Sequence, residues 1–253
     1  MRRPAAAALL AMILTTSLAA QQWTSADAQR ATKHYQTGWE LMSREAWADA
    51  AKEFREAISI DSKFALAYYA LGRAEVYQHK FVDAIRSYLK CREIYLARTS
   101  ERFTSQLDAN RALDNQILEY QGVLKALGNT GSSTGPTQTR SQSISHLQQE
   151  LARMQQARDR NSSVTMDVSV PYFVPLALGS AYFRNAQLAE AEREYKTAIE
   201  INPASGETHN NLAVIYLNTN RLDDAAKEIT LAEKSGYTVN PGLKDELKQK
   251  MGK

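Results

Sequence analysis

A spacing of about 34 residues, which occurs twice in this chain, constrains its fold more than any other feature. Glycine, small and aromatic residues recur with this period near both ends of the sequence. The first aligned set is Gly38, Trp47, Ala50, Phe54 and Ala57 with Gly72, Phe81, Ala84, Tyr88 and Cys91. The second aligned set is Leu178, Gly179, Tyr182, Leu188, Ala191, Tyr195 and Ala198 with Leu212, Ala213, Tyr216, Leu222, Ala225, Ile229 and Ala232. Such a period predicts stacked helix-turn-helix units, because one unit cannot bury its apolar face alone.

Composition supports an all-α fold. The chain has only six prolines, and long stretches without proline or glycine are rich in good helix formers. No run alternates apolar and polar residues for long enough to predict a sheet. We therefore expect an α-α solenoid built from two pairs of repeats.

The first twenty residues have the layout of a secretory signal peptide. Arg2 and Arg3 form a basic start, residues 5–14 are an apolar run, and cleavage fits best after Ala19 or Ala20. An uncleaved membrane anchor is the alternative, although the run is short for a bilayer span. No later segment is predicted to cross a membrane. The sequence thus predicts an exported protein, periplasmic or secreted.

Charge and cysteine content exclude some functions. Removing Arg2 and Arg3 lowers the net charge from +3 to +1, since residues 1–20 contain no acid, so nucleic acid is not an expected ligand. Cys91 is the single cysteine and cannot form an internal disulfide. It stands where the other repeats have alanine, so we expect a small buried residue.

Each repeat is predicted to be a pair of helices. In the first, one helix covers residues 31–44, a turn lies at Glu45-Ala46, and a second helix covers residues 47–60. Gly38 marks a close crossing of the two helices, where a side chain would keep them apart. The next unit, residues 64–98, repeats this pattern.

These residues resemble the tetratricopeptide repeat family. Its pattern has Leu-Gly or Leu-Ala and then Tyr in the first helix, followed by Ala, an aromatic residue and Ala in the second. Residues 172–205 and 206–239 match it well, and the former ends in the closing Pro203. The first two units depart from it, since Thr37 replaces the leucine, and Leu41 and Glu75 replace the tyrosine.

The chain beyond the last repeat is predicted to close the stack. Ser235-Gly236 ends a helix, and Pro241 opens another. Leu243, Leu247 and Met251 lie on one side of this last helix, which predicts an amphipathic cap.

Residues 99–171 interrupt the period. Two stretches carry apolar residues at coiled-coil spacing, and residues 128–142, rich in Gly, Ser and Thr, are predicted to be a flexible loop between them. We expect an antiparallel helical hairpin that projects from the solenoid. It either pairs only with itself, or forms a dimer or grips a partner. Its predicted apolar seams are Leu113, Ile117, Tyr120, Leu124 and Leu127, and Ile144, Leu147, Leu151 and Met154.

The predicted organisation is therefore a signal peptide (1–20), two repeats (31–98), the insertion (99–171), two repeats (172–239) and a capping helix (240–253).

The sequence carries no motif for catalysis, a metal or a cofactor. The four histidines are scattered, and none belongs to a His-Glu-x-x-His pair. A phosphate-binding loop, a nucleophile elbow and a Cys-x-x-Cys motif are all missing. We expect no enzyme, no metal site and no cofactor.

The family resemblance implies that the first helices of successive repeats line a concave groove for a protein or peptide. Together with the predicted signal peptide, it predicts a non-catalytic adaptor of the bacterial cell envelope. The alternative is a self-assembling structural protein that forms a homodimer through residues 100–160. Rings that pack under a neighbouring repeat or under the hairpin are the competing interpretation of each groove position. The groove-facing residues would be Tyr35, Trp39, Met42, Tyr69, Arg73, Val76, Tyr77, Phe173, Leu176, Ser180, Phe183, Arg184, Asn210, Val214 and Asn218.

Overall fold

The computed structural model describes residues 25–100 and 170–252, together with helical positions between 110 and 125 and between 144 and 158. The predicted signal peptide, the loop at 128–142 and Leu127 lie outside the described residues. Within the described parts the regular structure is helical throughout. The complete helices are α1 (Ser25–Ser43), α2 (Trp47–Ile60), α3 (Ala65–Tyr77), α4 (Phe81–Ser100), α7 (Phe173–Arg184), α8 (Leu188–Ile201), α9 (Gly206–Asn218), α10 (Leu222–Lys234) and α11 (Pro241–Met251).

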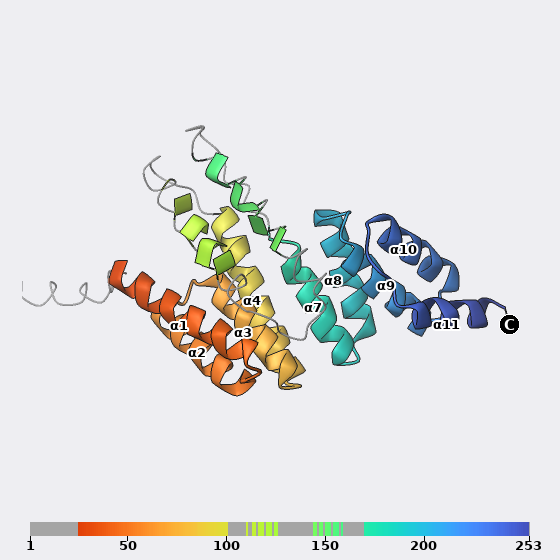
Figure 1. The fold of residues 1–253 in the computed structure, drawn as a ribbon, viewed down its shortest axis with the longest axis horizontal. Coiled ribbons are helices and arrows are strands. Elements are labelled where there is room, and N and C mark those ends of the chain that lie inside the picture. The colour runs from red at the N-terminus through yellow and green to blue at the C-terminus, as the bar shows by residue number, and fades with distance from the viewer. Residues whose placement is uncertain are drawn as a thin grey trace, which may run out of the picture.

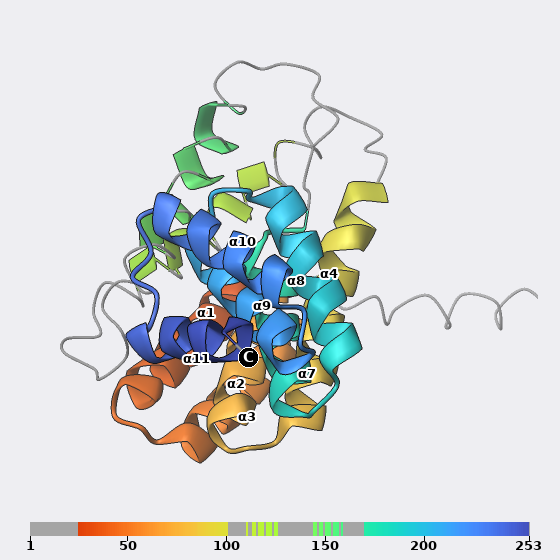
Figure 2. The ribbon, with the colours of Figure 1, turned by 90° about the vertical axis from the view of Figure 1, so that its right-hand side faces the viewer.

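The helices form an α-α solenoid (Figure 1). Helices α1/α2, α3/α4, α7/α8 and α9/α10 pack as hairpins, and α11 packs on α10 at the end. The second helix of each pair also contacts the first helix of the next, so α2 packs on α3 and α8 on α9. Figure 2 shows the molecule from the α11 end of the stack. The helix-turn-helix stack predicted from the repeat period is confirmed.

Glycine allows the two helices of a repeat to cross closely, as the sequence predicts. A Cβ on Gly72 would lie 2.5 Å from the Tyr88 ring, and one on Gly179 would lie 2.6 Å from the Tyr195 ring. Gly38 faces Phe54 in the same way. The fourth repeat has Ala213 and the smaller Ile229 at these places. In these repeats, an aromatic ring of the second helix therefore packs against a glycine of the first helix.

The turns inside the repeats share one hydrogen-bond pattern. The amide of Ala46 donates to the Leu41 carbonyl at 3.0 Å, and Lys80, Gln187 and Arg221 make the same contact in their own repeats. This bond spans five residues, as in a Schellman ending of a helix. Its left-handed residue is never glycine here, since φ is 59° at Glu45, 59° at His79, 60° at Ala186 and 58° at Asn220.

The stack continues across the insertion, because α4 packs against α7 although the whole of segment 101–172 lies between them in the sequence. Tyr69 of α3 meets Phe173 of α7 with ring centroids 4.9 Å apart. Arg92 Nη1 of α4 donates to both carboxylate oxygens of Glu194 of α8, at 2.8 and 3.0 Å. The two repeat pairs are therefore joined by a ring contact and an ion pair.

The described part of the insertion packs back on the repeats. Tyr120 and Leu147 are buried in the same core cluster as the repeat residues, with exposed fractions of 2% and 5%. Gly122 lies close to Thr32 of α1. Arg158 Nε lies 2.5 Å from Asp114 Oδ1, so the end of the second stretch lies beside the start of the first. The described part of the hairpin therefore packs on the repeats as well as on itself.

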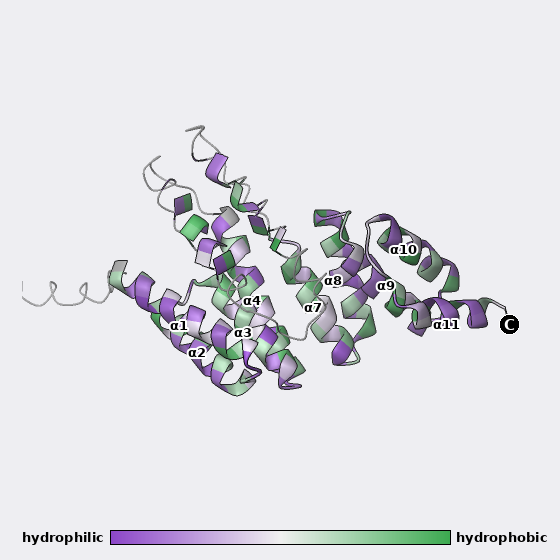
Figure 3. Ribbon diagram, viewed as in Figure 1, coloured by the Kyte–Doolittle hydropathy of each residue, from purple (hydrophilic) through white to green (hydrophobic). Residues whose placement is uncertain are grey.

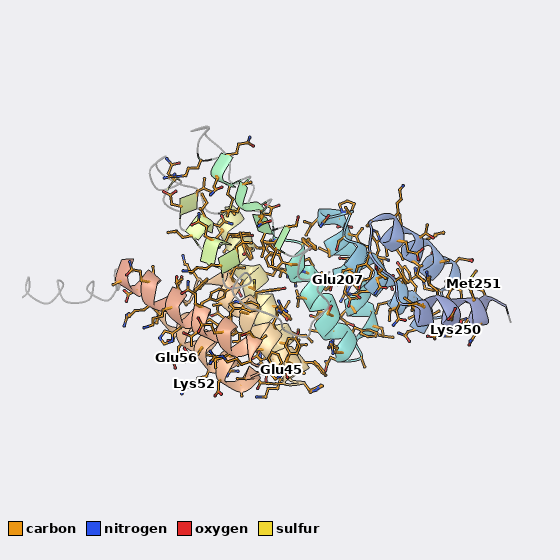
Figure 4. The ribbon with its side chains drawn as sticks, viewed as in Figure 1. Glu45, Lys52, Glu56, Glu207, Lys250 and Met251 are labelled. Atoms are coloured by element: carbon orange, nitrogen blue, oxygen red, sulfur yellow. The ribbon has the colours of Figure 1, made fainter. Side chains whose placement is uncertain are left out.

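The cap is formed by α11. Asn240 Oδ1 accepts a hydrogen bond from the Gly242 amide, and Leu247 is buried. Lys250 Nζ donates to the Leu217 carbonyl at 3.2 Å near the end of α9. Met251 was predicted on the packed side but is 51% exposed, in the last turn of α11 (Figure 4).

One acid lies in the core of the second repeat. Glu75 stands where the family pattern has tyrosine, and it is buried. Its carboxylate accepts hydrogen bonds from Arg55 Nη2 at 2.9 Å and Ser87 Oγ at 2.7 Å. Burial raises the pKa of Glu75, while these two hydrogen bonds act in the opposite direction. Glu75 thus links α2, α3 and α4.

Apolar residues concentrate in the middle of the stack. Figure 3 shows α7 mostly in green and white, whereas α11 at the end is mainly purple. Cys91 is fully buried, at the place where the other repeats have alanine. Within the described parts of the chain, no helix combines the length and apolarity that a bilayer crossing requires.

Candidate partner-binding surface

The three predicted groove residues of α1 do not form an accessible surface. Tyr35, Trp39 and Met42 have exposed fractions of 0%, 4% and 5%. The Tyr35 ring packs 5.0 Å from Phe64, which precedes α3 in the next repeat. The prediction that a partner contacts these side chains is therefore wrong for this conformation, because the neighbouring repeat covers them.

The predicted residues of α3 are more open. Tyr69, Arg73 and Val76 are partly buried, and Tyr77 is 45% exposed. The guanidinium of Arg73 lies 5.2 Å from the centroid of the Trp39 ring. Tyr77 stacks on Trp47 with centroids 4.3 Å apart, at the outer end of α3. Arg73 is thus the one cation among the predicted positions of α3, and its guanidinium makes a cation–π contact.

The residues of α7 divide between core and surface. Phe173 and Leu176 are buried, while Phe183 is partly buried and Arg184 is exposed. Ser180 accepts a hydrogen bond from the Tyr195 hydroxyl at 3.2 Å, so it serves to hold α8. Burial raises the pKa of Tyr195 to about 12.

The predicted residues of α9 are accessible to different degrees. Asn210 and Val214 are partly buried, and Asn218 is exposed. The side-chain oxygen of Asn210 is buried and has no hydrogen-bond partner among the described residues. A buried acceptor without a hydrogen bond lowers the stability of the folded chain, and a donor from a bound partner would remove this cost.

Glu207 is the residue that sequence reasoning missed. It is the second residue of α9 and lies near the middle of the stack, in the region of α7 (Figure 4). The side chain is partly buried, and the structure shows no ion pair or hydrogen bond of its carboxylate with any described residue. Glu207 stands one repeat period after Phe173, a predicted groove position, and this register was the available signal.

Burial dominates the electrostatics of Glu207. It raises the pKa of this carboxyl to about 7, and the positive charge of Arg73 acts in the opposite direction. The field of the helix N-terminus also favours the ionised form. Burial raises the pKa of four tyrosines near Glu207, and the negative charge of Glu207 raises it further; they are Tyr69, Tyr172, Tyr195 and Tyr237. Arg73 acts in the opposite direction on the pKa of Tyr69, and the hydrogen bond to Ser180 does so for Tyr195.

These residues define what we call the α3–α9 surface, which can supply aromatic area, one cation and two oxygen acceptors. Its accessible or partly accessible members are Tyr69, Arg73, Glu207, Asn210 and Val214. Aromatic area with a few polar groups is typical of surfaces that hold a polypeptide.

His34 and His209 each pair with a glutamate. His34 Nδ1 lies 2.7 Å from Glu53 Oε2, and His209 Nδ1 lies 2.6 Å from Glu228 Oε2. Both pairs join the two helices of one repeat at the same repeat position. In the part of the chain that the structure covers, no group of three or more His, Cys, Asp or Glu residues is arranged to hold a metal ion.

The chain is similar to tetratricopeptide repeat proteins. Residues 176–236 match the profile of the tetratricopeptide repeat family. No curated protein is significantly similar in sequence. TTC0263, a thermophilic TPR protein in Thermus thermophilus, is 16% identical, with 87% of this chain and 98% of that chain covered and a TM-score of 0.36. Pseudomonas aeruginosa pilF is 16% identical, with 84% and 79% covered and a TM-score of 0.33. YrrB, a TPR protein with an unusual peptide-binding site, is 15% identical, with 86% and 93% covered and a TM-score of 0.25.

Proposed function

Because residues 176–236 match the tetratricopeptide repeat family, we propose that this chain is a non-catalytic scaffold of the bacterial cell envelope that binds a polypeptide on its α3–α9 surface. The signal-peptide pattern of residues 1–20 supports export to the periplasm or the outside of the cell.

The observation that carries the proposal is the continuity of the stack. Because α4 packs on α7, the first helices α3, α7 and α9 follow one another without a break. Polar and aromatic groups from separate repeats therefore share one surface, although Arg73 and Glu207 lie on opposite sides of the insertion in the sequence. Such an extended surface suits a peptide or a helix.

A crosslinking pull-down from the native host tests this function. The tagged, exported protein is compared with an Asn210→Ala/Val214→Asp variant of the α3–α9 surface. A Lys52→Ala/Glu56→Ala variant is the matched control, since both residues are exposed on α2, away from this surface (Figure 4). We expect a partner that the control retains and the surface variant loses.

Self-assembly is the competing function. The exposed Leu118, at 63%, leaves apolar area on the described part of the insertion. If both variants recover only further copies of the chain, and light scattering gives a dimer that disappears on removal of residues 100–160, the homodimer replaces the adaptor.

A further inference from the structure

Glu207 differs from the buried acid of the second repeat in having no partner among the described residues. The acid in the core of the second repeat, Glu75, is paired with Arg55 and Ser87. Glu207 has no such partner among the described residues, although it is partly buried and its burial disfavours the charged form. A carboxylate kept in this condition lowers the stability of the folded chain, and residues of this kind concentrate at functional sites.

Asn210 adds a second acceptor on the same face of α9. It follows Glu207 by three positions, so the two side chains are neighbours on the helix surface. Its Oδ1 atom is buried and lacks a donor among the described residues. The Glu207 carboxylate and Asn210 Oδ1 therefore both require hydrogen-bond donors, and the carboxylate carries negative charge.

We propose that Glu207 and Asn210 form a subsite for an arginine side chain of the bound polypeptide, an inference that rests on the proposed scaffold function. A guanidinium has five N–H donors and no acceptor, and it can contact a carboxylate through two parallel hydrogen bonds. It also stacks on aromatic rings, and the partly buried Tyr69, which interacts electrostatically with Glu207, supplies one on this surface. Lysine would satisfy the charge with fewer directed contacts.

Arg73 carries the same positive charge as the proposed arginine ligand and therefore repels it. Its guanidinium lies over Trp39 and is not within ion-pair distance of Glu207. Coulomb attraction falls with distance, so a ligand cation in contact with Glu207 gains more than the more distant Arg73 removes. Neutralising Arg73 should therefore strengthen the binding of an arginine peptide.

Selection from a random dodecamer peptide library tests the subsite. The full mature chain, its Glu207→Gln variant and a Glu56→Gln control are each used as bait. We expect arginine to be enriched at one position on the parent and on the control, and not on Glu207→Gln. Thermal unfolding of each bait verifies that the variants are folded.

One selected peptide then serves as the probe in a double-mutant cycle. Glu207→Gln should raise its Kd about tenfold or more, as loss of a charge-assisted hydrogen bond predicts. Replacing the peptide arginine by glutamine should raise the Kd similarly, and the two changes together should add little further. Arg73→Gln should lower the Kd of the parent peptide.

The affinity should also fall between pH 8 and pH 5.5, as Glu207 gains a proton. Among the residues that the structure describes, the groups that interact electrostatically with it are Arg73 and Tyr69 of α3, Tyr172, Tyr195 of α8 and Tyr237, and the charges of these groups do not change in that range. Glu207→Gln should remove the pH dependence.

Two results overturn the inference. Peptides that bind the α3–α9 surface without enriched arginine, or with equal Kd for Glu207→Gln, refute the subsite and leave the scaffold function standing. A library from which no peptide binds the folded chain refutes both.

Discussion

At the scale of single residues, two features carry a cost that substitution can remove. The turn residues Glu45, His79 and Ala186 hold positive φ without being glycine or asparagine. Their Cβ atoms meet backbone atoms in this conformation, at a cost of about 1–2 kcal/mol. The unpaired Glu207 carboxyl is the second such feature.

Ala186→Gly should stabilise the chain by about 0.5–1 kcal/mol. Ala186 is exposed, so no packing is lost, and the relief of the left-handed strain exceeds the entropy that glycine adds to the unfolded state. Urea unfolding measures the change. Asn220→Gly is the matched control and should change stability less, since asparagine already tolerates this φ. A loss of stability in Ala186→Gly would show that the turn is not strained.

Glu207→Gln should stabilise the chain at pH 8 and leave it almost unchanged at pH 4. The folded pKa of about 7 lies above the ordinary value of 4.5, so both states are protonated below pH 4.5. As the pH rises from 4.5 to 7, the unfolded chain ionises first and the folded state loses stability, by up to about 3 kcal/mol. Glutamine cannot ionise and avoids this loss.

Urea midpoints at pH 4, 5, 6, 7 and 8 measure this effect. Glu56→Gln, at an exposed carboxylate, should follow the parent at every pH. A constant difference between Glu207→Gln and the parent from pH 4 to 8 would contradict the raised pKa.

At the scale of helices, three of the four repeats depend on the fit between a glycine and a ring. The contact recurs at Gly72 with Tyr88 and at Gly179 with Tyr195. The pair Ala213 and Ile229 shows that the same crossing accepts a methyl group when the opposite side chain is smaller. Side-chain volume is therefore shared between the two helices of a repeat.

Gly179→Ala should destabilise the chain by about 1–3 kcal/mol, because its Cβ would overlap the Tyr195 ring. In a Tyr195→Ile background, which copies the fourth repeat, the same substitution should cost less. Chemical unfolding of the four chains gives the coupling between the two sites. Equal costs in both backgrounds would exclude the ring as the cause.

The sequence predicts helix positions better than it predicts accessibility. Helix α2 begins and ends at the expected residues, because Trp47 and the small residues after it set a clear period. Helix α1 begins at Ser25, earlier than the expected residue 31, because buried residues begin only at Ala31 while good helix formers precede it.

The site shows the limit of this kind of prediction. Periodicity identifies which face of α1 carries Tyr35, but not that Phe64 of the next repeat covers it. Glu207 was missed because hydropathy and motif patterns give no signal for a lone acid that interacts with residues of α3 and α8 and with Tyr172 and Tyr237. Such a residue is identified only when the packed repeats are known.

At the scale of the whole molecule, the junction between α4 and α7 couples the unfolding of the two repeat pairs. Repeat arrays are held by nearest-neighbour interfaces, so each junction decides whether its two sides unfold together. Here the junction rests on the Tyr69–Phe173 contact and the Arg92–Glu194 pair. We expect the parent chain to unfold in one cooperative transition.

Phe173→Ala should separate the unfolding of the two repeat pairs. It removes most of a buried ring, at a cost of about 3–5 kcal/mol placed at the junction. Hydrogen exchange under native conditions should then show the amides of α9 opening independently of those of α2. Leu247→Ala in the cap is the control, which should lower stability without this separation. Uniform loss of protection in Phe173→Ala would place the weak junction elsewhere.

The continuity of the stack across residues 101–172 also has an evolutionary consequence. Since the repeats on either side pack as direct neighbours, mutations can lengthen or shorten the part of the intervening segment outside its core contacts, such as those of Tyr120 and Leu147, without changing the spacing of α3, α7 and α9. Whole repeats can be duplicated or lost on the same terms. The number of stacked repeats and the length of the insertion can therefore change independently in evolution.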